Sequence, residues 1–162
     1  MKFKKNFLVP LLLILIIIFI FNLIKKEEAS INILINEEDM IIKSEYIYNH
    51  PEAVVFPAVV RSSGKKPEET EYKGIEINLL FSSLGIDITK IKNITFNATD
   101  GYRIILPLEE IMMPRNVYLT FERDGEYLKS KKQGGNGPFQ LVTRKDSFSQ
   151  RWIKHVDEII LE

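Results

Sequence analysis

Two neighbouring stretches of the chain, 93–98 and 102–106, place an apolar residue at every second position, which is the period of a β-strand. Thr99-Asp100-Gly101 stands between them. Glycine adopts the positive φ of a tight turn without strain, and an aspartate side chain can accept a hydrogen bond from the nearby backbone. The pattern therefore predicts a β-hairpin with one apolar face, which the rest of the domain must cover. The residues of that face are Ile94, Phe96, Ala98, Tyr102, Ile104 and Leu106.

Much of the chain beyond residue 30 also has strand patterning, interrupted by turn residues. Pro57 lies inside an apolar run and cannot donate to a β-ladder, so we expect that run to be an edge strand or to be bulged. Asp124-Gly125 follows an alternating stretch and is a strong two-residue hairpin signal. Residues 61–71 are polar and contain a glycine and a proline, which predicts a loop. The predicted strands are 31–35, 40–48, 53–60, a strand ending at 77, 117–123, 139–143 and 156–161.

One segment has the pattern of a clear helix. Asn78 is a suitable N-cap, Gly85 suits the C′ position, and three leucines form an apolar stripe between them. We expect this helix to pack on the apolar face of the hairpin. Pro107 favours one or two further helical turns, which Pro114 ends. The expected class is therefore α+β: mostly β, with mixed sheets and one or two short helices, plus an N-terminal transmembrane helix.

The N-terminal segment is long and apolar enough to span a membrane. Residues 7–24 are interrupted only by Pro10 and Asn22, and at 1.5 Å per residue a helix would cover about 27 Å, close to the hydrocarbon thickness of a bilayer. A cleaved signal peptide would have a shorter apolar core followed directly by small residues, whereas Ala29 follows four charged residues. We therefore favour an uncleaved signal anchor over residues 1–26. Three lysines near Met1 predict a cytoplasmic N-terminus and an extracellular domain, in a single-pass protein of a bacterial cell membrane.

Charge and composition exclude several functions. Residues 1–26 contain five lysines and no acid, so residues 27–162 carry 17 basic and 22 acidic side chains, a net charge of −5. Nucleic-acid binding draws most of its affinity from phosphate neutralisation, so a mildly acidic domain does not fit a nucleic-acid partner. The chain contains no cysteine, which excludes disulfides, thiolate metal ligands and a cysteine nucleophile.

The strongest candidate for a ligand site is the glycine-rich stretch 134–138. Gly134, Gly135 and Gly137 could hold an anion through their backbone N–H groups, and basic residues that include Arg144 flank the stretch. It is not a P-loop, because no Gly-Lys-Ser/Thr follows it. The alternative interpretation is a flexible loop between two strands.

Other candidate groups have simpler structural interpretations. His50 and His155 are the only histidines, and they are 105 positions apart and outside any metal-spaced cluster. Exposed or singly hydrogen-bonded rings are therefore favoured over a shared metal site. Asp100 suits a turn, and Glu109 and Glu110 suit the first turn of a helix.

Four motifs occur in the order typical of one known family. They are Y-K-G-I-E-I-N-L-L-F-S-S-L-G at 72–85, D-G-Y at 100–102, G-G-N-G-P-F-Q-L-V at 134–142, and Q-R-W-I-K at 150–154 before the apolar run 156–161. Together they resemble the sulfite-oxidase-type molybdopterin-binding domain over roughly residues 53–161. The resemblance implies layered sheets with a β-grasp-like portion. It divides the chain into the anchor 1–26, a juxtamembrane strand region 27–52 and the module 53–162.

The resemblance also implies a cofactor for which this chain lacks a ligand. Enzymes of the family hold molybdenum through a cysteine thiolate and a pyranopterin dithiolene, whereas this sequence has no cysteine, and Gln140 stands where an arginine is usual. We therefore expect a membrane-anchored, extracytoplasmic, non-catalytic module without a bound cofactor, which binds a small anionic ligand or a surface protein and contacts the lipid bilayer through residues 7–24. No catalytic or metal-ligating residue is predicted.

The alternative is a cofactor-binding oxidoreductase, or a carrier of a pterin or another anion. In that case the resemblance implies that molybdopterin, or the other anion, is held by the loop 134–138. The candidate binding residues are Gly134, Gly135, Gly137 and Arg144.

Overall fold

The computed structural model describes residues 29–36 and 38–162. The predicted signal anchor lies outside the described residues. Within the described part of the chain, no helix is long and apolar enough to cross a membrane. Residues 30–35 and 38–48 form two strands and a short helix, and the two strands share a sheet with strands of the predicted module.

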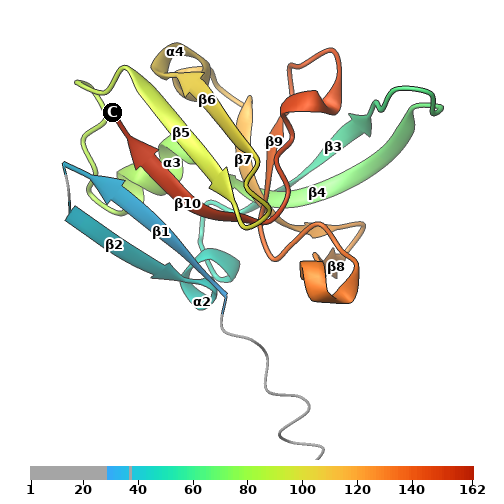
Figure 1. The fold of residues 1–162 in the computed structure, drawn as a ribbon, viewed down its shortest axis with the longest axis horizontal. Coiled ribbons are helices and arrows are strands. Elements are labelled where there is room, and N and C mark those ends of the chain that lie inside the picture. Colours follow the sequence, from blue (N-terminus) through green and yellow to red (C-terminus); the bar gives the residue numbers. More distant parts are fainter. Residues whose placement is uncertain (1–28, 37) are drawn as a thin grey trace, which may run out of the picture.

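Two sheets of five strands each make up the fold, the first on the left and the second on the right of Figure 1. The first has the order β2 (Glu38–Lys43), β1 (Ser30–Ile35), β10 (Val156–Leu161), β5 (Asn93–Ala98) and β6 (Arg103–Pro107). The second has the order β3 (Val54–Val60), β4 (Glu68–Glu76), β7 (Val117–Arg123) and β8 (Glu126–Tyr127), and β9 (Gln140–Thr143) also pairs with β7.

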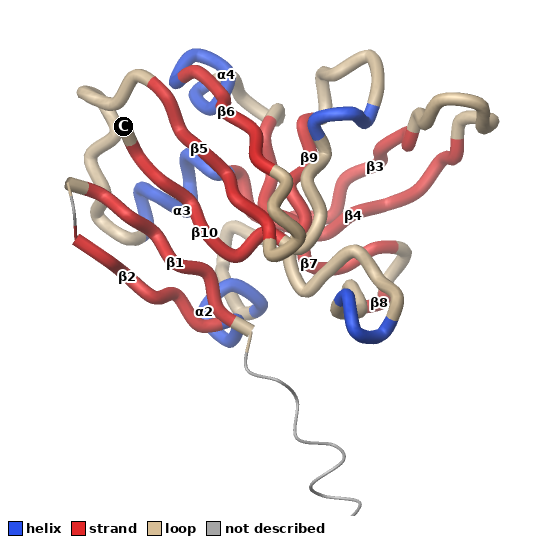
Figure 2. Tube along the Cα trace, in the orientation of Figure 1, coloured by secondary structure: helices blue, strands red, loops and turns tan. Residues whose placement is uncertain are grey.

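Short helices connect the strands (Figure 2). They are α2 (Ser44–Tyr48), α3 (Ile77–Ser83), α4 (Leu108–Met112) and the 3₁₀ turns η1 (Lys131–Gln133) and η2 (Ser149–Arg151). β1 runs parallel to β10, and the other neighbouring strands are antiparallel. The predicted α+β class with mixed, mostly β architecture is therefore confirmed.

The predicted hairpin is β5–β6. Gly101 has a φ of +85°, and the Tyr102 N–H donates to Asp100 Oδ1 at 3.1 Å, as the turn chemistry requires. Phe96 and Leu106 are fully buried, but Tyr102 is 51% exposed, so its assignment to the apolar face was wrong. The β5–β6 ladder begins only at Arg103, which leaves Tyr102 in the turn, where its hydroxyl donates to the Gln150 carbonyl.

One hydrophobic core joins the two sheets and α3. Phe96 of the hairpin, Phe81 of α3 and Phe121 of β7 are all fully buried in the same cluster. In Figure 1, α3 lies behind the strands of the first sheet. Gly85 occupies the predicted C′ position with a φ of +70°, but α3 begins at Ile77 rather than after Asn78, whose side chain instead accepts a hydrogen bond from the next N–H.

A second buried cluster lies on the other face of β7. It explains why β7 is buried on both faces although its sequence alternates. Trp152 anchors this cluster, and its Nε1–H donates to the Thr143 carbonyl at 2.9 Å. The members of the cluster are Phe56, Ala58, Tyr72, Tyr118, Val142 and Trp152.

Two predicted element boundaries are wrong for tertiary reasons. The strand predicted over 40–48 ends at Lys43, which pairs with Ser30, the first residue of β1. The chain turns there into α2, which buries Ile47. The loop predicted over 61–71 ends earlier, because Glu68 pairs with Val60 and begins β4. The edge position of β3, predicted from Pro57, is confirmed.

Candidate functional site

The strongest candidate site is an open hollow lined by basic residues. The pairing of Val117 with Thr143 brings the start of β7 beside the end of β9. Arg115 therefore lies close to Arg144 and Lys145. Arg115 precedes β7, and the other two residues follow β9 directly. With Pro114 they line a hollow of about 520 Å³, which we call the basic hollow.

Arg144 is the half-buried cation of the basic hollow. Its guanidinium lies 5.4 Å from the centre of the Phe56 ring, and its Nε–H donates to the Pro57 carbonyl at 3.3 Å. These contacts come from the edge strand β3 and hold the guanidinium against the second buried cluster. Arg144 is therefore oriented by packing rather than by an ion pair.

A buried asparagine fixes the backbone around the basic hollow. Asn116 donates from its side chain to the Glu110 carbonyl, and its side-chain oxygen accepts the Lys145 N–H at 3.2 Å. Its backbone carbonyl accepts the Arg144 N–H at 2.7 Å. Arg115 has a φ of +56°, and its N–H donates to the Glu76 carboxylate at 2.7 Å.

The basic hollow is a local positive charge on an acidic domain. Among the described residues, neither Arg115, Arg144 nor Lys145 forms an ion pair with a carboxylate. Glu76 accepts hydrogen bonds from the Arg115 N–H and the Tyr118 hydroxyl, and Asp146, which follows Lys145, pairs with Arg151. Burial, reinforced by the Glu76 charge, raises the pKa of Tyr118, so this phenol stays neutral. Three clustered cations with this arrangement can accept a small anion.

The glycine-rich loop uses its own N–H groups. Gly134 donates to the Lys131 carbonyl, Gly135 to the Ser130 carbonyl and Gly137 to the Lys129 carbonyl, at 2.8–3.0 Å. An anion could bind these groups only by displacing those bonds. Of the four predicted binding residues, Arg144 lines the basic hollow, and the three glycines do not. The structure therefore does not bring these four residues together in that hollow.

His155 joins two motifs that are far apart in the sequence. Its N–H donates to the Asn136 carbonyl, its carbonyl accepts the Thr99 N–H, and its ring Nδ1 lies 2.9 Å from the Gly137 carbonyl oxygen. The residue is buried, with 7% of its surface exposed. The glycine-rich loop and the turn of the hairpin are therefore connected through a buried histidine.

His50 lies in a polar cluster that the sequence did not reveal. Its Nδ1 accepts the Glu52 N–H, so Nε2 carries the proton of the neutral ring and donates to Ser83 Oγ at 2.8 Å. The Ser83 hydroxyl donates to the Leu80 carbonyl and accepts from the Tyr46 hydroxyl. In this tautomer the ring cannot take a proton from Ser83, so the pair is structural rather than a nucleophile with its base.

This cluster predicts a pH dependence of stability. Burial lowers the pKa of His50, so the folded chain resists a proton that the unfolded chain accepts below about pH 6.5. The free energy of unfolding is therefore expected to fall as the pH decreases below about 6.5. Urea denaturation at a series of pH values, followed by Trp152 fluorescence, measures this slope. The His50→Gln variant should have a shallower slope, and equal slopes in the two proteins would contradict the assignment.

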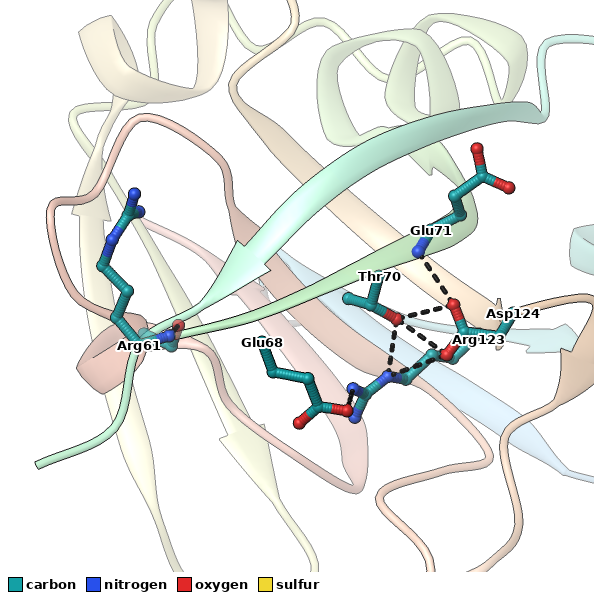
Figure 3. A network of polar contacts seen from close by, with 7 residues as sticks. Arg61, Glu68, Thr70, Glu71, Arg123 and Asp124 are labelled. Carbon is teal, nitrogen blue, oxygen red and sulfur yellow. Dashed lines mark hydrogen bonds and ion pairs between the residues drawn. The ribbon is translucent and has the colours of Figure 1, made fainter. Parts of the chain in front are cut away.

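A polar network closes the β7–β8 turn (Figure 3). The Asp124 carboxylate accepts hydrogen bonds from the Glu71 N–H and the Thr70 hydroxyl, which lower the pKa of Asp124. Arg123 donates to Thr70 and pairs with Glu68. These groups are mutually satisfied and stabilise the hairpin turn. In the described part of the chain, no group of three or more His, Cys, Asp or Glu side chains could hold a metal ion.

Comparisons with known proteins support the fold. No protein-family model matches the sequence, and a search of curated proteins finds no match. Among solved structures, the sulfane dehydrogenase SoxCD from Paracoccus pantotrophus has a similar fold, with a TM-score of 0.65 and 18% sequence identity. The similarity covers 82% of this chain and 38% of that chain, so this chain spans less than two fifths of its length. This chain therefore shares its fold with part of that structure.

Proposed function

We propose that this chain is a non-catalytic binding module, tethered to the cell membrane by residues 7–24 and exposed outside the cytoplasm, that holds a small anionic ligand in the basic hollow. The observation that carries the proposal is the grouping of Arg115, Arg144 and Lys145 without a carboxylate partner among the described residues. Such a grouping is unfavourable on its own, because like charges repel one another, and a bound anion relieves the repulsion.

The chemistry of the donor set supports a non-catalytic role. A molybdenum centre of the sulfite-oxidase type needs a protein thiolate, and the sequence contains no cysteine. The residues present do not fit that centre. Gln140 is buried, and its amide is neutral, so it offers no positive charge to a cofactor phosphate.

A second candidate is a carrier of a pterin or another anion through the Gly134–Pro138 loop. The fold likeness to part of SoxCD favours it, since that protein is a dehydrogenase by name. Against it, Gly134, Gly135 and Gly137 already donate to carbonyls of their own loop. A partner protein on the cell surface would be a third kind of ligand for the same module.

Anion binding is tested by titrating inorganic phosphate into the ¹⁵N-labelled full chain in detergent micelles. Saturable shifts are expected at the amides of Arg115, Arg144 and Lys145. Each charge-assisted hydrogen bond contributes about 1.5–3 kcal/mol, so the double variant Arg115→Gln/Lys145→Gln should weaken phosphate binding by about tenfold or more. Both side chains are exposed, so these substitutions leave the core intact.

The matched control removes two equally exposed cations beside the glycine-rich loop. Lys129→Gln/Lys131→Gln causes the same change in net charge and should leave phosphate affinity within about twofold. If this control weakens binding more than the first variant, the ligand binds at the loop, as the second candidate requires. Stoichiometric molybdenum or pterin fluorescence in the purified chain would overturn the non-catalytic assignment.

A further inference from the structure

We propose that the surface formed by Ile41, Lys43 and Tyr46 rests on the outer face of the membrane that holds the tether. With Ile42, Glu45 and Asn49 these residues line an open hollow of about 570 Å³, which we call the apolar hollow. This inference depends on the proposed tethering by residues 7–24. It adds an orientation of the domain and a second contact with lipid.

The apolar hollow lies beside the point where the N-terminal segment enters the fold. Lys43 pairs with Ser30, the first residue of β1. The N–H of Ser44, the first residue of α2, donates to the Ala29 carbonyl at 2.8 Å. Ile41 pairs with Asn32, two residues along the strand, so it lies within about 10 Å of Ser30.

The short connection keeps this surface close to the bilayer. Residues 25–29 separate the predicted membrane segment from Ser30. The six Cα–Cα steps from Ile24 to Ser30 span at most about 22 Å in any conformation. The headgroup region accounts for about 5–8 Å of that distance on each side of the hydrocarbon core. Ser30 therefore lies at most about 15 Å above the headgroup region.

The side chains at this end suit a membrane interface. Ile41 is 69% exposed and Tyr46 is 41% exposed. Burial of their apolar surface would be energetically favourable. Tyrosine and lysine are favoured at the headgroup level, where an apolar body meets a polar tip. The acidic residues of β2, Glu38 and Asp39, pair with the opposite end of β1, away from Ser30. The apolar end of β2 is thus the end nearest the tether.

Lipid is a better occupant of this surface than a protein partner. The patch is small, and its position beside Ser30 leaves a partner protein little room between the domain and the membrane. Other exposed apolar residues, such as Ile105 at 56%, lie on the opposite edge strand of the same sheet. Ile105 is three strands away from β1, a lateral distance of about 14 Å. Across the sheet it is level with Leu34, near the end of β1 that is farther from Ser30.

The absence of cysteine makes the test direct. Ile41→Cys and Ile105→Cys each introduce a single thiol into the full chain, both on exposed isoleucines of edge strands. Each variant is labelled with bimane and reconstituted into phosphatidylcholine vesicles, with or without lipids that carry a nitroxide near the headgroup. The nitroxide should quench the label at position 41 roughly twofold or more relative to the label at position 105, because interfacial residues insert about 5–10 Å.

Vesicle flotation separates failure of the tether from failure of this inference. If the chain does not float with the vesicles, the proposed tether is wrong and the inference falls with it. If the chain floats but both labels are quenched equally weakly, the tether stands and the membrane contact of the apolar hollow is overturned. Circular dichroism of both variants checks the fold. If Ile105→Cys fails to fold, Glu38→Cys at the far end of β2 replaces it as the weakly quenched control. If Ile41→Cys fails to fold, Lys43→Cys beside Ser30 replaces it, with strong quenching expected.

Discussion

Truncation of Phe96 to alanine is expected to lower the free energy of unfolding by about 3–5 kcal/mol. Phe96 is fully buried in the middle of β5, paired with Ile159 of β10 on one side and with Ile104 of β6 on the other. It belongs to the core that joins the two sheets and α3. Its removal leaves a cavity that two hydrogen-bonded strands cannot close. Urea denaturation followed by Trp152 fluorescence measures the change.

The control for this prediction is Ile105→Ala on the neighbouring strand. Ile105 pairs with Thr95 and projects from the other face of the sheet, where it is 56% exposed. Its truncation should change the free energy of unfolding by about 0.5 kcal/mol or less. Similar losses for the two variants would mean that the apolar face of the hairpin is not the core face.

Replacement of Gly135 by alanine is expected to lower the free energy of unfolding by about 2–4 kcal/mol. A Cβ atom at this position would lie 2.2 Å from the Lys129 carbonyl oxygen and 2.6 Å from its carbon. These are backbone atoms, so they cannot move without breaking the loop. The bond from the Gly135 N–H to the Ser130 carbonyl would be strained with them. Chemical denaturation of the full chain measures this loss in the same way.

The Gly134→Asn variant separates the two reasons for glycine in this loop. Gly134 has a φ of +74°, and a Cβ atom there would meet nothing within 4 Å. Asparagine tolerates this conformation, so the expected loss is about 1 kcal/mol or less. If Gly135→Ala were as well tolerated as Gly134→Asn, the close approach of the two backbone segments would be refuted. The glycine at 135 would then require a different explanation, such as access for a ligand.

Local chemistry could be predicted from the sequence wherever one short segment decides the outcome. The Asp100-Gly101 turn, the Asp124-Gly125 turn and the Gly85 C′ position all have the positive φ that was expected. In each case a few neighbouring residues choose a conformation by backbone sterics alone. Pro57 placed its strand at an edge for an equally local reason, since it lacks an N–H.

Strand pairing and hydrogen-bond partners could not be predicted from short segments of the sequence. The segment 44–48 has strand-like alternation, but the ladder between β1 and β2 ends at the pair of Ser30 and Lys43, and the chain continues as α2, which buries Ile47. The three glycines of the loop 134–138 seemed available to an anion, yet their N–H groups are used by carbonyls of residues 129–131. Hydrogen-bond partners depend on the path of the chain, which composition and spacing do not specify.

By itself the sequence determined the strand periods, the tight turns, the absence of thiol chemistry and an apolar N-terminal segment of bilayer length. These follow from residue type and nearest neighbours. Only the tertiary structure decided that β1 lies beside β10, that His155 joins two distant motifs, and that Arg115 and Arg144 line the same hollow. These residues are separated by about 20 to 130 positions, and sheet pairing and core packing bring them together.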